Sequence, residues 1–289
     1  MIKVEFHISN ASSPGHAKSN TKKGSSRNHW FTPRGLEDLP ERNHLFSNDT
    51  SIGCGFYPLH HLEQFALDLE KSLTIGEFGK KHKWCGTDVK IMGSHIDEKT
   101  DITICVPQIA HYVNSLDEYI ENIGAVRKHI QDFAKEHYKY ENVTFNINTR
   151  DEYDTEELYL TATGSSIESG DEGLVGRGNR VNQIISINHP MSMEGASGKN
   201  PVYHIGKLYY IAAHKISRLI YEEFCISNEV YLVSQSGRTL VDPWKVVVRI
   251  DEVEAIHHNI AQIEEFVATQ LKVIPAITKE LVDGEIVIA

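Results

Sequence analysis

The residues with the clearest chemistry lie between Thr163 and Lys207, where glycines alternate with cations, carboxylates and amides. Glycine lets the backbone approach a ligand closely and adopt positive φ. Arginine and lysine beside it supply the charge that phosphate oxygens require. The charged side chains of this stretch include Asp171, Glu172, Arg177, Arg180, Glu194, Lys199 and Lys207. This combination predicts a polyphosphate site.

The same stretch has almost no apolar periodicity, so we expect it to be mostly loop. A loop this long within a compact domain is usually functional or disordered. Disordered tracts are repetitive and polar, whereas this stretch mixes glycine, charge and amide in no repeating order. Its GASGK segment (195–199) is not a Walker A loop, because Met193 replaces the first glycine and Asn200 replaces the serine or threonine.

Composition narrows the function classes. A chain of 289 residues is long enough for two ordinary domains, and 40% hydrophobic with 24% charged residues fits a soluble globular protein. The net charge of −11 argues against a nucleic-acid binder. No apolar run approaches a membrane span, and the start MIKVEFHISN alternates like a strand rather than a signal peptide. Four scattered cysteines favour free thiols in a reducing cytosol, so we expect a cytoplasmic protein.

Hydrophobic periodicity predicts strands and helices after about residue 50. Before it, only residues 2–8 alternate as a strand, and a polar tract follows. The expected strands are 88–93, 100–106, 142–148, 157–162, 229–235 and 244–250, and the expected helices are 59–73, 115–137, 203–224 and 255–271. Ser115 can cap the second helix. Two β-rich units with long helices on one face predict an α+β fold of tandem sandwiches.

Four long segments together carry a resemblance to a known family. They are NDTSIGCGFYPL (48–59), DEGLVGRGNRVN (171–182), HPMSMEGASGKNPV (189–202) and HIGK (204–207). With them the chain resembles the archaeal-type methionine adenosyltransferases, the S-adenosylmethionine synthetases, from its first strand to its C-terminus. Spaced signatures of this length are far more specific than a lone glycine motif.

The resemblance implies tandem α/β-sandwich domains with a partial first domain. Residues 1–50 are then a remnant of the first domain, 51–150 a central domain, and 151–289 a C-terminal domain with the glycine-rich substrate loop. It implies an enzyme that makes S-adenosylmethionine from ATP and L-methionine and releases phosphate and pyrophosphate. Mg²⁺ and K⁺ are its implied cofactors, and its active sites are built between two chains.

The resemblance also assigns residues to roles. Asp49 matches an aspartate on the nucleoside or methionine side of the substrate. Asp171 and Arg177 match a pair used for substrate and triphosphate, and we expect Asp171 to hold the metal. Lys99, Arg177 and Lys199 would be the catalytic cations, because preorganised positive charge stabilises the departing triphosphate. Further expected binding positions are Asp97, Arg180, Asn200 and Lys207.

One motif of the family is missing from these residues. The family's first domain carries Gly-His-Pro-Asp, whose histidine assists triphosphate departure and whose aspartate binds Mg²⁺. The segment SPGHAK (13–18) lacks the proline and aspartate. Smaller departures are Tyr203 and His189, where close relatives have asparagine and arginine, and Gln183 in place of glycine. We therefore expect a companion chain that supplies the missing residues, and an oligomer in which apolar sheet faces are covered.

Three hypotheses stay open at this point. The chain is a subunit of a split synthetase, or a non-catalytic relative that binds nucleotide or S-adenosylmethionine or regulates a full-length synthetase, or a truncated product without function. The retained charged residues favour the first hypothesis, because like-charged side chains around an empty pocket are costly without a ligand.

Other conspicuous residues have structural explanations that we expect to hold. The pairs His60–His61 and His257–His258 fit a solvated surface, because adjacent residues of a helix point in different directions. Cys54 fits a small buried residue. The cationic run GKKHK (79–83) fits a solvated loop, and the tyrosines of helix 203–224 fit core packing.

Overall fold

The computed structural model describes residues 45–138, 142–165, 180–192, 194–250, 253–286 and 288, with 253–259 as backbone only. The described chain forms two compact units. Unit 1 combines the segment ending at Tyr57 with Pro190–Ile288, and unit 2 is Pro58–His189. These boundaries differ from the expected ones near residues 50 and 150, because the strand that begins at Ile52 pairs with a strand of the C-terminal part. The strand expected at 2–8 lies outside the described residues.

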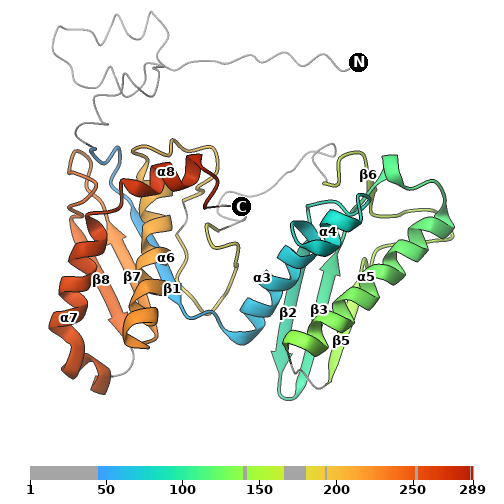
Figure 1. Ribbon diagram of the computed structural model, residues 1–289, viewed down its shortest axis with the longest axis horizontal. Helices are drawn as coiled ribbons and strands as arrows, with labels where there is room; N and C mark the ends of the chain where they lie inside the picture. The colour runs from blue at the N-terminus through green and yellow to red at the C-terminus, as the bar shows by residue number, and fades with distance from the viewer. Residues whose placement is uncertain are drawn as a thin grey trace, which may run out of the picture. The chain divides into compact units, whose positions relative to one another are not determined.

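Unit 1 is a three-stranded antiparallel sheet covered by helix α6 (Figure 1). Its elements are β1 (Ile52–Tyr57), α6 (Ile205–Phe224), β7 (Asn228–Val233), β8 (Lys245–Ile250), α7 (Val253–Leu271) and α8 (Ala276–Val282). The strand order is β1-β7-β8. Helix α6 is almost entirely buried over its first half, and it ends at Cys225, whose φ of 55° is left-handed.

Two glycines of β1 let α6 lie directly on the strand. A Cβ at Gly53 would stand 2.6 Å from the backbone nitrogen of Tyr210, and one at Gly55 would stand 2.5 Å from Cα of His214. Both distances are well inside van der Waals contact, so any side chain there would push the helix off the strand. The close approach brings the first turn of α6 beside the segment that precedes β1.

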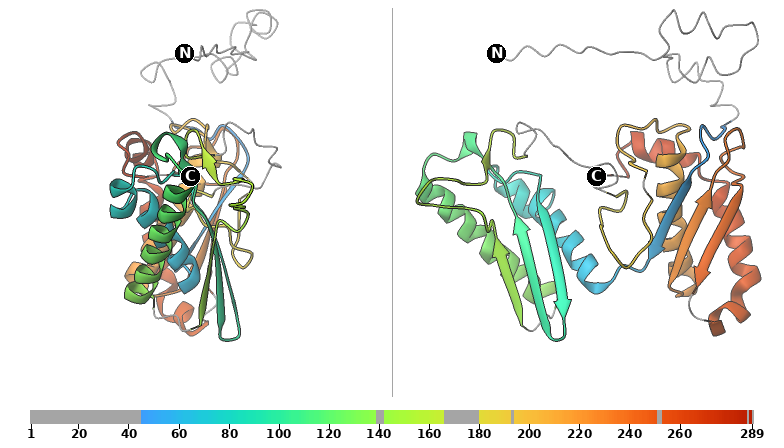
Figure 2. Two further views of the ribbon diagram at one scale, coloured as in Figure 1. Left: turned by 90° about the vertical axis from the view of Figure 1, so that its right-hand side faces the viewer. Right: turned by 180° about the vertical axis from the view of Figure 1, so that it is seen from behind.

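Unit 2 also places helices on one face of a three-stranded sheet (Figures 1 and 2). Its elements are α3 (His61–Thr74), α4 (Glu77–Lys81), β2 (Lys90–Ile96), β3 (Lys99–Cys105), β4 (Gln108–Ile109), a 3-10 turn (Ala110–Tyr112), α5 (Leu116–His137), β5 (Val143–Ile147) and β6 (Leu160–Thr161). The order β2-β3-β5 is antiparallel at the hairpin and parallel at β3–β5, the two strands that α5 connects.

The core of unit 2 is built from ordinary large side chains. Phe65 and Leu69 of α3, Ile102 and Ile104 of β3, and Ile130 of α5 are all completely buried. Helix α5 begins at Ser115 as expected, since the Ser115 hydroxyl accepts a hydrogen bond of 3.2 Å from the Glu118 N–H.

Most predicted elements are present, with several differences. Of the strand expected at 157–162, Leu160–Thr161 forms β6, and Glu157 makes only an isolated bridge with Glu152. Strand β1 and the short helices α4 and α8 were not expected, and α4 makes part of the 79–83 run helical rather than loop. Glycine weakens a strand pattern, and β1 contains two glycines.

The expected apolar sheet face is only partly present in unit 2. Ile102 and Ile104 point toward the unit's own helices, where they are buried. On the opposite face, the exposed residues of β2 and β3 are mostly polar, apart from Met92 and Ile96, which are 75% and 70% exposed. On β2 and β3 the predicted apolar face is therefore limited to Met92 and Ile96.

The smaller structural expectations are largely confirmed. Cys54 is buried, and Tyr209 and Tyr210 belong to the core. All four cysteines are free thiols. His60 is exposed, and its ring also caps α3 by accepting a 3.4 Å hydrogen bond from the Leu62 N–H. None of the helices that the structure describes is long and apolar enough to cross a membrane.

Candidate functional site

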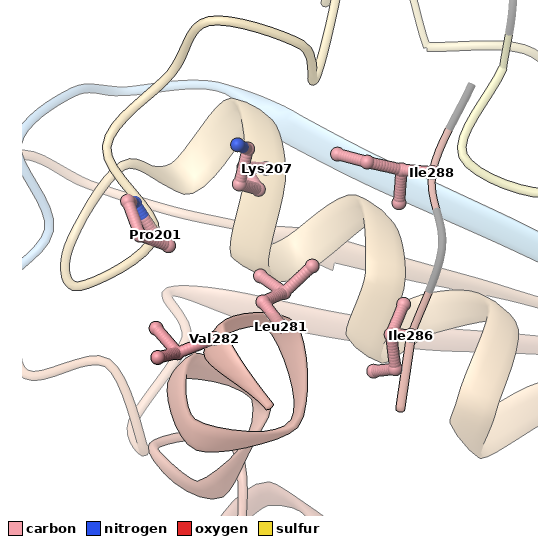
Figure 3. A pocket seen from close by; sticks show the side chains of 6 residues that line it. All are labelled: Pro201, Lys207, Leu281, Val282, Ile286 and Ile288. Atoms are coloured by element: carbon pink, nitrogen blue, oxygen red, sulfur yellow. The ribbon is translucent and has the colours of Figure 1, made fainter. Parts of the chain in front are cut away.

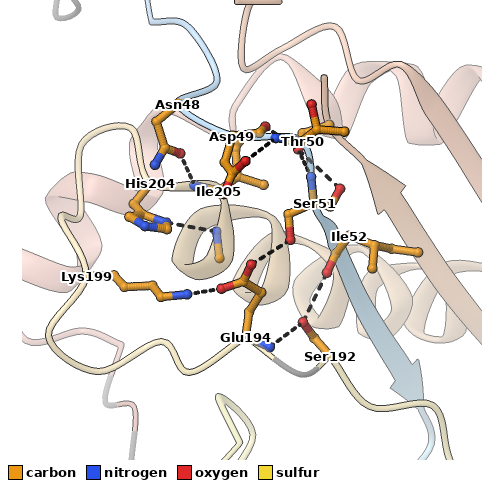
Figure 4. A network of polar contacts seen from close by, with 12 residues as sticks. Asn48, Asp49, Thr50, Ser51, Ile52, Ser192, Glu194, Lys199, His204 and Ile205 are labelled. Atoms are coloured by element: carbon orange, nitrogen blue, oxygen red, sulfur yellow. Dashed lines mark hydrogen bonds and ion pairs between the residues drawn. The ribbon is translucent and has the colours of Figure 1, made fainter. Parts of the chain in front are cut away.

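The charged cluster of unit 1 lies where the segment before β1 meets the start of α6 (Figure 4). The Asn48 side-chain oxygen accepts a hydrogen bond of 3.0 Å from the Ile205 N–H, the first backbone donor of the helix. The N-terminal end of a helix carries partial positive charge and attracts anions. This end of α6 is therefore the natural place for a negatively charged ligand in unit 1.

Serine residues fix the entry into β1. The Ser234 hydroxyl donates to the Asp49 carbonyl (2.8 Å) and accepts from the Ser51 N–H (2.8 Å). Among the described residues, the Asp49 carboxylate accepts one hydrogen bond, of 2.7 Å, from the neighbouring Thr50 N–H. Asp49 is exposed. The backbone at Asp49 is thus held firmly, while its carboxylate stays available to a ligand.

An ion pair packs against the first turn of α6 in this cluster. Lys199 Nζ pairs with Glu194 Oε2, and the other Glu194 oxygen accepts a hydrogen bond of 2.8 Å from the Ser51 hydroxyl. The pair lies against Gly206, where a Cβ would stand 2.5 Å from Lys199 Nζ and 2.7 Å from Glu194 Oε2. Glycine at 206 therefore leaves the space that this ion pair fills.

His204 is the residue that precedes α6, and it caps the helix with its side chain. Its Nδ1 accepts a hydrogen bond of 3.1 Å from the Gly206 N–H. Burial lowers the pKa of His204, and the positive charge of Lys199 lowers it further, while Asp49 acts in the opposite direction. The ring is therefore kept neutral inside a group of charges.

Lys207 is a buried cation, with only 8% of the residue exposed. It lines a cavity of about 370 Å³ with apolar walls (Figure 3): Pro201, Leu281, Val282, Ile286 and Ile288. No described residue forms a hydrogen bond or ion pair with its ammonium, and burial lowers its pKa. A buried ammonium without a partner is costly, and an anionic ligand would remove that cost.

Burial also lowers the pKa of Lys199, and the Asp49 carboxylate opposes this effect. The cluster as a whole combines two ammonium groups, two carboxylates and a neutral imidazole at the positive end of a helix. Such a set can bind a polyanion through the lysines and a hydroxyl or ammonium group through the carboxylates. Within it, the Ser51 hydroxyl lies within hydrogen-bond reach of the Glu194 carboxylate, which also pairs with Lys199.

The structure brings together four of the predicted site residues. Asp49, Lys199, Asn200 and Lys207 all belong to unit 1, around the start of α6. Asn200 helps to shape the loop, because its side-chain oxygen accepts a hydrogen bond of 2.8 Å from the Val202 N–H. The roles predicted for these residues stay predictions.

The other predicted residues lie elsewhere. Asp97 and Lys99 belong to unit 2, at the exposed turn between β2 and β3, where Asp97 has a φ of 56°. Arg180 also belongs to unit 2 and is buried. Asp171 and Arg177 lie outside the described residues.

Sequence reasoning gave no role to Ser51 or His204, and it named Glu194 without its partner. Ser51 and Glu194 meet across 143 positions of sequence, which no local pattern can indicate. His204 is part of the HIGK signature, and its place directly before an apolar helix was the available signal. One departure from the family pattern gains meaning here: Gln183 has a φ of 66°, a conformation that glycine adopts most readily.

Comparison with known proteins identifies the family. The family model described as S-adenosylmethionine synthetase (AdoMet synthetase) matches residues 33–285. An S-adenosylmethionine synthase of Halobacterium salinarum is 40% identical over 243 residues, which are 83% of this chain and 59% of the relative. One from Hyperthermus butylicus is 37% identical over 260 residues, which are 88% of this chain and 64% of the relative.

A solved structure supports the fold. An unusual S-adenosylmethionine synthetase from Campylobacter jejuni matches with a TM-score of 0.50 and 13% identity, covering 79% of this chain and 61% of that one. The chain belongs to the S-adenosylmethionine synthetase family. It spans about three fifths of the length of the curated relatives named here.

Proposed function

We propose that this chain is a subunit of a methionine adenosyltransferase, which makes S-adenosylmethionine from ATP and L-methionine and releases phosphate and pyrophosphate. The observation that carries the proposal is the cluster of Asp49, Lys199, His204 and Lys207 at the positive end of α6. It lies within the residues that the family model matches.

The chemistry asks little of the protein beyond position and charge. The methionine sulfur is already a competent nucleophile, so attack on C5′ of ATP requires no activated serine or cysteine. Negative charge then develops on the departing triphosphate, and fixed cations that meet this charge lower the barrier. Lys199 and Lys207 are suited to this task, with Arg177 and Lys99 as further proposed contacts.

Lys199 can act only if its ion pair changes. In the described state Glu194 neutralises it, so a triphosphate must compete with Glu194 for the ammonium. Lys207 has no such competitor among the described residues and lies almost fully buried. We therefore propose that Lys207 binds the anion first. Lys199 then exchanges Glu194 for the bound triphosphate.

Mg²⁺ and K⁺ belong to the proposal through the family. No three histidine, cysteine, aspartate or glutamate side chains gather as a metal site in the described part of the chain. A nucleotide-bound Mg²⁺ takes phosphate oxygens and water as ligands and needs only one or two protein carboxylates, and the exposed Asp49 carboxylate of the cluster could supply one. Asp171 is a proposed ligand from the resemblance and lies outside the described residues. When bound, Mg²⁺ would neutralise charge on the triphosphate.

The missing family motif motivates the need for a companion. No Gly-His-Pro-Asp sequence occurs in the 289 residues. These residues therefore do not supply the histidine and aspartate of that motif, and we propose that a companion chain in a heteromeric complex provides them alongside Asp171. Exposed apolar residues such as Met92 and Ile96 are candidates for covered positions in such a complex.

An assay of the purified chain tests the proposal. With ATP, L-methionine, Mg²⁺ and K⁺, the chain alone should form no S-adenosylmethionine above background. Affinity purification from its native cells should recover a companion that carries Gly-His-Pro-Asp, and adding it should restore turnover. Product formation by the chain alone contradicts the need for a companion. Recovery of a full-length synthetase instead favours the alternative, a non-catalytic regulatory subunit that binds nucleotide or S-adenosylmethionine.

A further inference from the structure

One polar group at the centre of the cluster has no task in the proposed chemistry. The backbone of His204 forms hydrogen bonds both to the preceding loop and to the first turn of α6. Its N–H donates to the Asn200 carbonyl (3.2 Å), and its own carbonyl accepts from the N–H groups of Lys207 and Leu208 at 3.0 Å each. Its ring is therefore anchored on the first turn of α6, and only Nε2 lacks a partner among the described residues.

The helix cap decides which ring nitrogen carries the proton. Nδ1 accepts the Gly206 N–H at 3.1 Å, and a backbone N–H is a fixed donor. A ring nitrogen that accepts a hydrogen bond carries no proton, so the neutral ring must carry its proton on Nε2. Folding of the helix therefore fixes the tautomer before any ligand arrives.

The surroundings favour a neutral ring with this donor. Lys199 and Lys207 both act on His204 from its own loop and helix, and Asp49 acts from the segment before β1. Burial and the two lysines favour the uncharged imidazole, and Asp49 opposes them. A neutral N–H in such a place can donate to an anion without adding a charge that must be desolvated.

We propose that His204 donates a hydrogen bond from Nε2 to a phosphate oxygen of the nucleotide, in a tautomer fixed by the cap on α6. The inference rests on the proposed function, because it needs an anionic ligand at this helix end. It goes further by giving the site a neutral hydrogen-bond donor beside its two lysines. Sequence reasoning did not identify this donor.

A purely structural role as helix cap is the competing explanation, and two substitutions separate the roles. In His204→Asn, the amide oxygen can replace Nδ1 as the cap, because asparagine is among the best capping residues, but the distal donor is lost. In His204→Gln, the amide group reaches the region of Nε2 but is too long for the cap. Lys199→Ala serves as the independent marker of the phosphate site.

The experiment measures binding of inorganic tripolyphosphate to the full chain by calorimetry, and the ring tautomer by ¹⁵N nuclear magnetic resonance. We expect the Nε2–H tautomer at neutral pH and a shift of that signal on binding. His204→Asn should keep the wild-type melting temperature and bind about tenfold more weakly, the size expected for one hydrogen bond to a charged group. His204→Gln should melt about 4 °C lower, as expected for a lost cap, and bind more tightly than His204→Asn.

Each other outcome has a clear meaning. An Nδ1–H tautomer, or His204→Asn binding as well as wild type while Lys199→Ala binds poorly, overturns the role of His204 and leaves the proposed function standing. No binding by the wild type at millimolar tripolyphosphate, or full binding by Lys199→Ala, contradicts the phosphate site itself and the inference with it.

Discussion

Helices pack on the three-stranded sheets of the two units in different ways. In unit 1, α6 lies on β1 with almost no side chain between them, because Gly53 and Gly55 leave the backbone bare. In unit 2, α3 and α5 lie on β3 through completely buried side chains such as Phe65 and Ile102. The candidate site belongs to the sheet with the close contact.

This difference explains where charged chemistry can be held. The close contact brings the first turn of α6 within hydrogen-bond distance of Asn48, and Gly206 leaves room for the Glu194–Lys199 ion pair against the same turn. Large side chains at these positions would separate the elements by several ångströms. In unit 2 the corresponding space is filled by buried apolar side chains, and the start of α3 carries a Glu63–His189 contact of 3.4 Å rather than a lysine–carboxylate pair.

The strongest prediction concerns the glycine contact. Gly55→Ala places a methyl group against the backbone of α6, which cannot rotate away as a side chain could. We expect a loss of about 3 kcal/mol or more in the free energy of unfolding, at the upper end for overpacked cores. Urea unfolding followed by circular dichroism measures it.

Gly93→Ala is the matched control in unit 2. The three atoms nearest to its Cβ would all belong to the Leu62 side chain, with Cδ1 at 2.9 Å, and that side chain can move. We expect a change within about 1 kcal/mol. Equal effects of the two substitutions would show that the sheets do not differ in the way described.

The next prediction concerns the cations that are proposed to meet the triphosphate. Lys199→Ala, and likewise Arg177→Ala, should lower turnover of the reconstituted complex on the order of a hundredfold or more, because each removes a cation that meets the triphosphate as its charge grows. Lys135→Ala, on the exposed side of α5, should leave turnover unchanged. Near-normal rates in both site variants would mean that the glycine-rich stretch has been misassigned.

The sequence indicated the long helices of both units because apolar residues recur at helical spacing, and Ser115 marked the start of α5 correctly. It did not indicate β1, since Gly53 and Gly55 weaken the strand pattern while meeting a requirement imposed by a helix far along the chain. A local sequence pattern predicts local structure, whereas the glycines of β1 are required by the close packing of α6.

The candidate site divides in the same way. Asp49 and Lys199 could be named from signature segments, and the structure places both at the start of α6. The Ser51–Glu194 hydrogen bond and the cap by His204 could not be named, because they depend on backbone atoms or on distant partners. Arg177 and Asp171 rest on the sequence resemblance alone.

The smallest predicted effect is a pH dependence of stability that the two units share, with burial of a histidine as the main cause in each. In unit 2, burial lowers the pKa of His129, with Asp132 acting against this and His82 acting with it. The half-buried His129 ring lies 4.6 Å from that of Phe78, and its Nε2 is 3.0 Å from the Ser72 hydroxyl. In unit 1, burial and Lys199 lower the pKa of His204.

The sign follows from proton binding. The unfolded histidines titrate near 6.5, and the folded ones bind protons only at lower pH. As the pH falls through about 6.5 the unfolded chain takes up more protons than the folded chain, so stability falls; well above that pH these groups add almost no slope. Urea midpoints at pH 7.5, 6.5 and 5.5 should decline mostly over the last step, and His129→Gln should make that decline shallower. An unchanged slope in His129→Gln would show that burial of this ring does not oppose its protonation, and would leave His204 as the remaining source to test with His204→Asn.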